Sequence, residues 1–229
     1  MTIDFLEALN LLEHAGIRVV RAKYVDSAQD AVAFAARREA RDSRVLPIVL
    51  STASEDDSPA RRRAGAEDAL HSGPAIQAAY ERLANLTTAP RILARDYVGS
   101  GTDIALAYGR NDKGQEFLEL RSGDHATEQL LPIDETGARV LVEHMLAHDH
   151  RGRSEKSRRM VEHLVLRVCG VLDEYPIEAL ELDPVRLHEN TYTVVGASIT
   201  APSRLRVEKR LPNHAHDRKA FGYRPTGRQ

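Results

Sequence analysis

The apolar residues of this chain change their spacing repeatedly, and the order of these changes restricts its fold more than any other feature. Apolar positions at helical spacing predict helices in the opening segment up to Gly16 and at 27–42, 75–86, 134–147 and 155–173. Short β-rich runs predict strands at 17–25, 45–51, 91–98, 102–109, 116–120, 178–187 and 191–199. Helices and strands do not alternate regularly, so we predict an α/β protein with a mixed (α+β) sheet rather than a doubly wound parallel sheet.

Turn and cap residues mark several of the predicted boundaries. Ser27 and Asp30 have the spacing of a capping box, in which side chains satisfy free N–H groups at the start of a helix. The segments Gly99–Gly101 and Asn111–Gly114 lie between predicted strands and contain the residues of tight turns. We therefore expect hairpins at both places, and a third around His188–Asn190.

Composition excludes several classes of protein. The 229 residues include 32 basic and 34 acidic side chains, and this net charge of −2 gives no overall attraction to nucleic acid or anionic lipid. With 42% hydrophobic residues, the chain can bury a real core in one α/β domain or two small ones. Its one cysteine, Cys169, excludes an intramolecular disulfide and fits the reducing cytoplasm. We expect neither secretion nor a membrane span, which needs ~20 apolar residues.

Charge is distributed unevenly along the chain. Residues 1–200 hold 24 basic and 32 acidic side chains, whereas residues 201–229 hold 8 basic and 2 acidic ones. This basic tail could contact nucleic acid, or it could be a disordered or partner-docking extension. The second interpretation is favoured because Phe221 and Tyr223 are its only stacking residues. The segment 52–69 has no periodicity and predicts a mobile loop.

Three groups of residues are candidates for chemistry. His144 and His148 are four apart on a predicted helix and could hold a metal, although histidines are also typical of a solvated helix end. Glu181 and Asp183 share one face of a predicted strand, where they could bind a hard divalent cation or lie on a solvated edge. Cys169 lies in an apolar helix face, which predicts a buried, inert thiol rather than a nucleophile.

Several segments, taken in order, resemble those of one family. They are LLEHAGIRVV, YVDSAQDAVAFAA, LPIVLS, AIQAAYERL, ILARDYVGSGTDIALAYGRND, LPIDETGARVLVEHM, RGRSEKSRRMVEHLVLRVCGVLDEYP and ALELDPVRL. From about Leu11 to Ile199 the series is similar to the ATP-grasp domain of NDP-forming acyl-CoA synthetases, of the acetyl-CoA synthetase β-subunit type. The resemblance implies an ATP-grasp-like fold of two small lobes, 1–90 with the mobile loop 52–69 and 91–200, followed by the basic tail 201–229.

The resemblance also implies roles for individual residues. A family glutamine near the nucleotide base corresponds to Arg95, and two family glutamates correspond to Asp103 and Glu128, so a nucleotide pocket is expected at these three residues. The family's Mg²⁺ ligands, an aspartate and an asparagine, correspond to Glu181 and Asp183. The implied cofactors are Mg²⁺ and ATP or ADP, with CoA bound through a partner.

Other positions depart from the family pattern. Ser51 stands where the family has a lysine that reaches a nucleotide phosphate. The family loop with a phosphate-relay histidine and several glycines falls on Pro59–Ala66, where Gly65 is the one glycine. A second glycine-rich loop of the family falls on Leu120–Asp124. The resemblance therefore implies retained metal ligands beside a depleted phosphate site.

Two functional hypotheses follow. In the first, the chain is the ATP-grasp subunit or domain of an acyl-CoA ligase system. It binds Mg-nucleotide between its lobes, with Arg61–Arg63 supplying the charge of the missing lysine, and works with a CoA-binding subunit or as a homo-oligomer. In the second, it is a non-catalytic structural or regulatory subunit that has lost phosphate binding, because phosphoryl transfer depends on positioning and charge neutralisation. Neither hypothesis involves a membrane or nucleic acid.

Overall fold

The structure is a computed structural model that describes residues 1–36, 47–53, 69–86, 91–147, 154–188 and 191–202. Its helices are α1 (Phe5–His14), α2 (Ala28–Ala36), α5 (Gly73–Leu86), α6 (Glu135–Ala147) and α7 (Glu155–Glu174). Its strands are β1 (Ala22–Val25), β2 (Ile48–Ala53), β3 (Arg91–Asp96), β4 (Thr102–Arg110), β5 (Glu116–Ser122), β6 (His125–Leu130), β7 (Ala179–His188), β8 (Thr191–Val194) and β9 (Ala197–Thr200). The five predicted helices are confirmed within these residues, whereas β6 is a strand that the sequence pattern does not predict.

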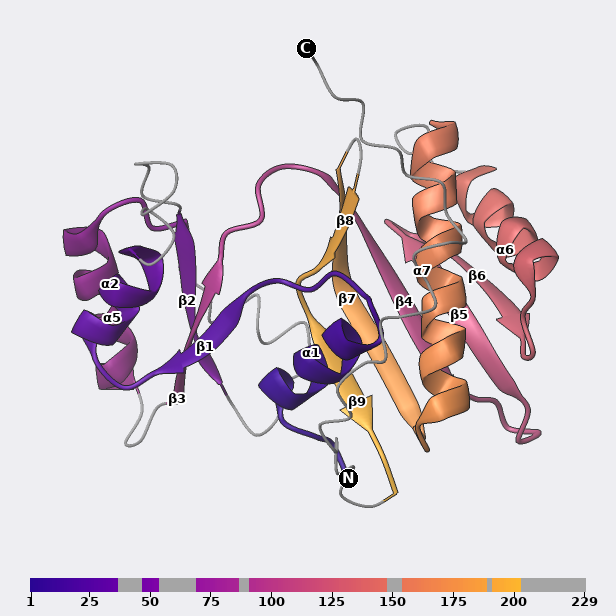
Figure 1. The fold of residues 1–229 in the computed structure, drawn as a ribbon, viewed down its shortest axis with the longest axis horizontal. Coiled ribbons are helices and arrows are strands. Elements are labelled where there is room, and N and C mark those ends of the chain that lie inside the picture. Colours follow the sequence, from indigo (N-terminus) through magenta and orange to yellow (C-terminus); the bar gives the residue numbers. More distant parts are fainter. Residues whose placement is uncertain (37–46, 54–68, 87–90, 148–153, 189–190, 203–229) are drawn as a thin grey trace, which may run out of the picture.

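The strands form two antiparallel sheets, each covered by its own helices (Figure 1). The smaller sheet has the order β1-β3-β2, and α2 and α5 pack against it. The larger sheet has the order β6-β5-β4-β7-β8, with β9 also paired to β7. Helices α1, α6 and α7 lie on one face of the larger sheet. This arrangement confirms the predicted mixed α/β class.

Each sheet builds its own hydrophobic core. The smaller core includes Phe34 of α2, Ile76 of α5 and Ile92 of β3. The larger core joins the six-stranded sheet to α1, α6 and α7. The sequence predicts a first lobe of residues 1–90, but residues 3–20 contribute to the larger core, because the apolar face of α1 packs beside β9. Helix α1 and the segment after it therefore pack with the larger sheet and not with the smaller one.

Helix α1 connects the two lobes through its N-cap residue, Asp4. The Asp4 Oδ1 atom accepts a hydrogen bond from the backbone N–H of Leu6 at 2.9 Å, which caps the helix. Its Oδ2 atom accepts hydrogen bonds from the hydroxyl of Tyr24 in β1 at 3.0 Å and from Arg91 Nη1 in β3 at 3.1 Å. One carboxylate thus binds a helix of the larger core and two strands of the smaller sheet.

One predicted hairpin is confirmed and another is wrong. Asn111–Gly114 joins the paired strands β4 and β5, and Gly114 has the positive φ of +75° that favours glycine. Gly99–Gly101 instead connects the two sheets, since β3 and β4 belong to different ones. A Cβ at Gly101 would clash with the carbonyl oxygen of Leu187. Glycine is needed there for close packing against β7 and not for a turn.

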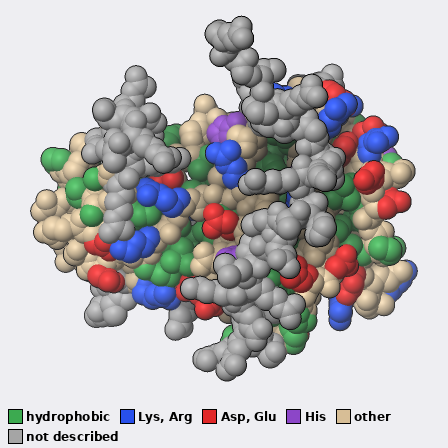
Figure 2. Space-filling view, in the orientation of Figure 1, with side chains coloured by type: hydrophobic (Ala, Val, Ile, Leu, Met, Phe, Trp, Pro, Cys, Tyr) green, Lys and Arg blue, Asp and Glu red, His purple; other side chains and the backbone are tan. Residues whose placement is uncertain are grey.

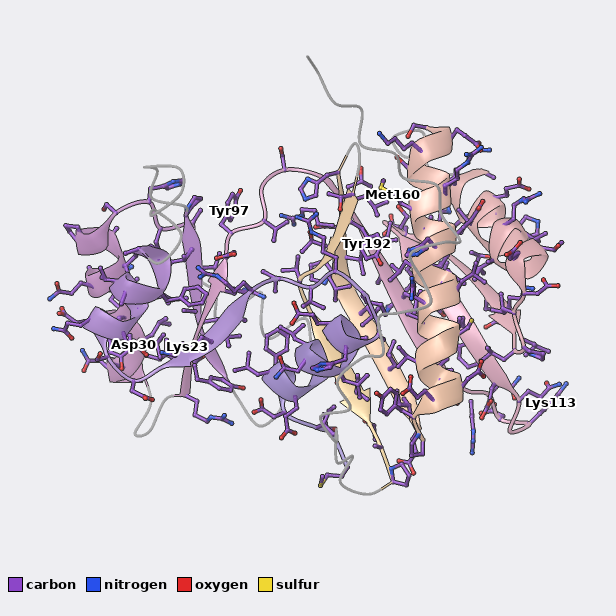
Figure 3. The ribbon with its side chains drawn as sticks, in the orientation of Figure 1. Lys23, Asp30, Tyr97, Lys113, Met160 and Tyr192 are labelled. Atoms are coloured by element: carbon purple, nitrogen blue, oxygen red, sulfur yellow. The ribbon has the colours of Figure 1, made fainter. Side chains whose placement is uncertain are left out.

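Several finer predictions can also be checked. The pairing of β7 with β8 confirms the third hairpin, although the predicted strand 191–199 is divided into β8 and β9. Ser27 Oγ accepts a hydrogen bond from Asp30 N at 3.0 Å, which confirms the N-terminal cap of α2. The Asp30 carboxylate accepts hydrogen bonds from Lys23 Nζ at 2.7 and 2.8 Å, and Figure 3 shows the two side chains together in the smaller lobe.

Surface and terminal predictions are tested only in part. The predicted loop lies outside the described residues from 54 to 68, and the basic tail lies outside them from 203 onward.

In the described part of the chain, no helix has the length and apolarity needed to cross a membrane. Figure 2 shows basic and acidic side chains interspersed over one side of the molecule.

Candidate functional site

Most of the expected site residues lie on the face of the larger sheet opposite α6 and α7, which we call the open face. Side chains along a strand alternate between two faces. Leu118 of β5 and Leu182 of β7 are fully buried in the core, whereas their neighbours Glu119 and Glu181 are only partly buried. The charged residues of the open face are Asp103, Glu119, Arg121, Glu128, Glu181, Asp183 and Arg186.

Strand register places three glutamates in one row across the open face. Glu128 of β6 lies opposite Glu119 of β5, which lies opposite Ala107 of β4. Ala107 in turn lies opposite Glu181 of β7. Because neighbouring strands are about 4.8 Å apart, the backbones at Glu128 and Glu181 are separated by roughly 14 Å. These two residues are too far apart to share one cation, whereas Glu181 and Asp183 are two residues apart on one strand.

Arg121 of β5 links two of these glutamates. Its Nη2 atom donates a hydrogen bond to Glu181 Oε1 at 3.0 Å. Its Nε atom lies 3.0 Å from Glu119 Oε1, an ion-pair contact without hydrogen-bond geometry. The intervening strand β4 contributes the small residues Ala105 and Ala107 here, so the long side chain can cross it. The three charged side chains keep 29% to 39% of their surface exposed. Each ion pair is therefore expected to contribute under about 1 kcal/mol.

Asp103 of β4 is held by Arg186 of β7. The guanidinium donates two hydrogen bonds to the carboxylate, from Nε to Oδ1 at 2.7 Å and from Nη2 to Oδ2 at 2.8 Å. Its Nη1 atom donates to the carbonyl oxygens of Val98 at 2.6 Å and Gly99 at 3.1 Å. The hydrogen bonds to Asp103 raise the pKa of the Arg186 guanidinium, while burial lowers it by less. Arg186 thus fixes the segment between the sheets and engages both oxygens of Asp103.

Asp183 lies at an irregular point of β7. The register of β4 against β7 shifts between Ile104 and Leu106, and the peptide bond between Asp183 and Pro184 is cis. The backbone N–H of Asp183 donates to the carbonyl oxygen of Gly196 at 3.0 Å. A Cβ at Gly196 would clash with the Asp183 carbonyl oxygen, so only glycine allows this close approach.

The remaining expected residues belong to the smaller sheet. Arg95 of β3 lies two positions from Leu93, so both side chains project from the same face, and Leu93 packs in the larger core. Ser51 of β2 lies opposite Leu93 and is only 1% exposed, and Arg95 is 9% exposed. A short, buried hydroxyl at position 51 cannot extend to a phosphate as a lysine side chain can.

Arginines of the chain engage part of the oxygen ligand set that a magnesium ion would need on the open face. Mg²⁺ prefers near-octahedral oxygen ligands at about 2.0–2.1 Å. One oxygen of Glu181 is paired with Arg121, and both oxygens of Asp103 are paired with Arg186. Among the residues that the structure describes, no three histidine, cysteine, aspartate or glutamate side chains converge on a position that could hold a metal ion.

Two other candidates from the sequence have different outcomes. His144 is exposed on α6, but His148 lies outside the described residues, so the histidine pair stays a prediction. Cys169 is half-buried on α7 and packs against the larger core. Burial, with a smaller effect from Asp173, raises the pKa of its thiol to about 11. A thiol that stays protonated at neutral pH agrees with the predicted inert cysteine.

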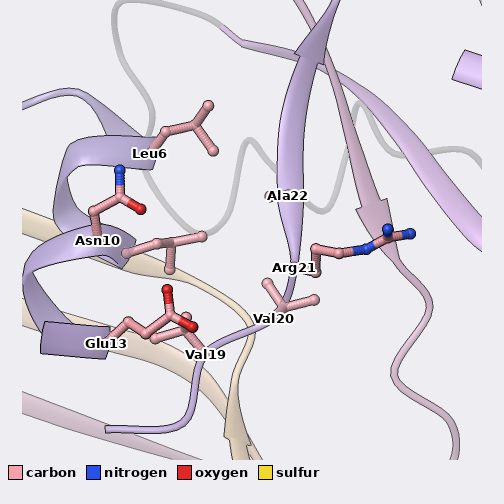
Figure 4. A pocket seen from close by; sticks show the side chains of 8 residues that line it. Leu6, Asn10, Glu13, Val19, Val20, Arg21 and Ala22 are labelled. Atoms are coloured by element: carbon pink, nitrogen blue, oxygen red, sulfur yellow. The ribbon is translucent and has the colours of Figure 1, made fainter. Parts of the chain in front are cut away.

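A cavity between α1 and residues 19–22 has a volume of about 220 Å³ (Figure 4). Its walls are formed by Leu6, Leu9, Asn10 and Glu13 of α1 and by residues 19–22. Arg21, the one cation of this lining, points away from α1 and pairs with Asp96 at 3.0 Å. Pockets for drug-sized ligands usually measure about 300–1,000 Å³, so this cavity is too small for a nucleotide.

Sequence reasoning missed three charged residues of the open face: Glu119, Arg121 and Arg186. The alternation of Glu119 and Arg121 with buried leucines is a signal that both lie on one exposed face. Their meeting with Glu181, which is 60 residues from Arg121, follows only from the strand order. Local sequence patterns carry no information on that order.

Comparisons with known proteins identify the fold. No protein-family model matches the chain, and no curated protein gives a significant match. A dinucleotide-forming acetyl-coenzyme A synthetase from Ca. Korarchaeum cryptofilum, solved with coenzyme A and Ca-AMPCP, superposes with a TM-score of 0.72 at 18% identity, over 87% of this chain and 93% of that one. A protein from Pyrococcus horikoshii superposes with a TM-score of 0.74 at 15% identity, over 89% and 92% of the two chains.

A more distant likeness extends the same result. ATP citrate lyase from Methanothrix soehngenii, solved with citrate and coenzyme A, superposes with a TM-score of 0.55 at 8% identity, and the match covers 86% of this chain but 48% of the lyase. The chain therefore has the ATP-grasp fold. More particularly, it has the form of that fold found in NDP-forming acetyl-CoA synthetases, which confirms the family resemblance at the level of structure.

Proposed function

We propose that this chain is the ATP-grasp subunit or domain of an acyl-CoA ligase system, and that it acts there as a structural or regulatory component. The fold supports the first part, since the likeness to an acetyl-coenzyme A synthetase extends over 87% of the chain. The observation that carries the second part is the hydrogen bond between Arg121 and Glu181, which engages one of the two expected metal ligands.

Phosphoryl transfer needs groups that neutralise charge as it develops on the transferred phosphate. In the proposed non-catalytic role this requirement is absent, which agrees with the burial of Ser51 at the position of the family's lysine. It also agrees with the pairing of Asp103 and Glu181 with arginines of the same chain. The open face is then an internally paired surface of the subunit rather than a reaction centre.

A second candidate function keeps nucleotide binding. Its support is that Glu181 and Asp183 share one face of β7, and that the Glu181 side chain is still 35% exposed. In this candidate, Mg-nucleotide binds between the lobes near Arg95, Asp103 and Glu128, and Arg121 releases Glu181. Binding of CoA is assigned to a partner in both candidates, and the reducing cytoplasm is the proposed compartment.

Calorimetry on the purified chain separates the two candidates. The non-catalytic role predicts no heat of binding with Mg·ATP or Mg·ADP at nucleotide concentrations up to millimolar. Binding that disappears in the double variant E181Q/D183N would instead establish the second candidate. Gln and Asn are amide isosteres that remove the two negative charges while nearly keeping the side-chain shape, so the structure of β7 is expected to be kept.

Co-purification from a native extract tests the shared part of the proposal. A CoA-binding protein should be recovered with the chain in stoichiometric amount. A chain that always migrates alone, at the size of one copy, contradicts membership of a ligase complex but leaves the calorimetric result unaffected.

A further inference from the structure

We propose that Arg121 occupies the place of a divalent cation on the open face, where the positive charge of its guanidinium pairs with Glu119 and Glu181. The inference rests on the proposed function, in which the open face is an internally paired surface and not a reaction centre. It goes further because it names the Arg121 guanidinium as the group that takes the place of a metal ion on this surface.

The position of Arg121 in the sheet makes this role possible. Glu119 on β5 and Glu181 on β7 are separated by β4, so their backbones are about 10 Å apart. Arg121 spans this gap because the intervening positions of β4 are Ala105 and Ala107. Larger side chains at these alanines would block the path between the two carboxylates.

The contacts resemble those of a bridging cation. Two different nitrogen atoms of the guanidinium approach two carboxylates, each at 3.0 Å. A divalent cation bound to Glu181 Oε1 at about 2.1 Å would lie close to the Arg121 guanidinium, whose Nη2 donates a hydrogen bond to the same oxygen at 3.0 Å. Because both groups are positively charged, the guanidinium and a metal ion are expected to compete for this oxygen.

Charge explains why removal of Arg121 should open the site. Glu119, Glu181 and Asp183 carry three negative charges, and Arg121 is bound between the first two of them. Without the guanidinium, the negative charge on this face is no longer offset by Arg121, and carboxylate oxygens such as those of Glu181 and Asp183 are the ligands that a hard divalent cation prefers. The change Arg121→Met removes the guanidinium and keeps an unbranched apolar chain in place of the aliphatic stem that covers β4.

Titration with Mn²⁺, followed by the electron paramagnetic resonance of the free ion, tests this role without nucleotide. The R121M variant is expected to gain one site that binds Mn²⁺ at least tenfold more tightly than the wild-type chain. The gain should disappear when E181Q and D183N are added to R121M. The matched control is R110M, which breaks the exposed pair of Arg110 and Glu116 on the same hairpin and should gain nothing.

Two results would overturn the inference. One is an R121M variant that melts cooperatively and gains no Mn²⁺ site. The other is wild-type binding of Mn²⁺ that E181Q/D183N abolishes, which can be measured even where R121M does not fold. Neither result changes whether a CoA-binding protein co-purifies with the chain. Failure of this inference is therefore distinguishable from failure of the proposed function.

Discussion

The two faces of the six-stranded sheet are built from alternate residues of the same strands, yet different interactions hold them. On the covered face, Leu118 and Leu182 are fully buried beneath helices, where contact is stabilising in almost any orientation. On the open face, Glu119, Arg121 and Glu181 depend on specific pairings and remain partly exposed. The covered face thus determines whether the sheet forms, and the open face determines what it can bind.

The largest expected effect is on the covered face, where Leu118→Ala removes a fully buried side chain from β5. Loss of buried apolar surface and the cavity left behind should lower the free energy of unfolding by about 2–5 kcal/mol. Urea unfolding followed by circular dichroism measures the change. The control is Leu130→Ala on β6, where the side chain is 48% exposed. Equal losses at both positions would show that the covered face is not the main source of stability.

The contrast between the faces also explains how much could be predicted from the sequence. Helices such as α7 are visible in the spacing of Val161, Leu164, Val165 and Val168, because burial acts on every turn in the same way. Glu181 and Asp183 could be placed on one face for the same reason. The edge strand β6 could not be predicted, since its side chains are at least partly exposed on both faces and show no apolar alternation.

The paired state of the open face could not be predicted either. Asp103 and Arg186 are 83 residues apart, and their contact follows from the pairing of β4 with β7. The sequence pattern also predicts a hairpin at Gly99–Gly101, where the structure has a connection between the two sheets. A glycine required by close approach to another strand has the same sequence signal as one required by a turn.

A second prediction concerns Gly196, where the backbones of β7 and the segment before β9 approach closely. The Cβ added by Gly196→Ala would clash with the Asp183 carbonyl oxygen. Displacement of packed backbone is expected to cost about 1–3 kcal/mol. The control is Gly170→Ala on α7, where no atom lies near the added Cβ, and a stabilisation of up to about 1 kcal/mol is expected from helix propensity. Thermal unfolding of both variants gives the comparison, and a neutral G196A would contradict it.

A third prediction concerns Arg186, which donates hydrogen bonds to Asp103 and to two backbone carbonyl oxygens. Arg186→Met removes hydrogen bonds to Asp103 and to the carbonyl oxygens of Val98 and Gly99. Loss of this set should cost about 1–2 kcal/mol and increase hydrogen exchange in the segment between the sheets. Arg159→Met, which breaks an exposed pair with Glu155 on α7, should cost less than about 0.5 kcal/mol. Should the two variants lose equal stability, the carbonyl contacts of Arg186 would have no structural role.

The smallest expected effect is at Glu119, the direct neighbour of Leu118 on β5. Glu119→Gln removes one charge from the contact with Arg121, while the hydrogen bond from Arg121 to Glu181 can persist. Because these side chains are about one third exposed, the coupling energy in an E119Q/R121M double-mutant cycle should be below about 1 kcal/mol and should decrease in high salt. Urea unfolding at two salt concentrations measures it. A coupling as large as the loss in L118A would mean that charge pairing, and not burial alone, holds the sheet together. The open face could then not lose Arg121 without losing its fold, because binding and stability would depend on the same residues.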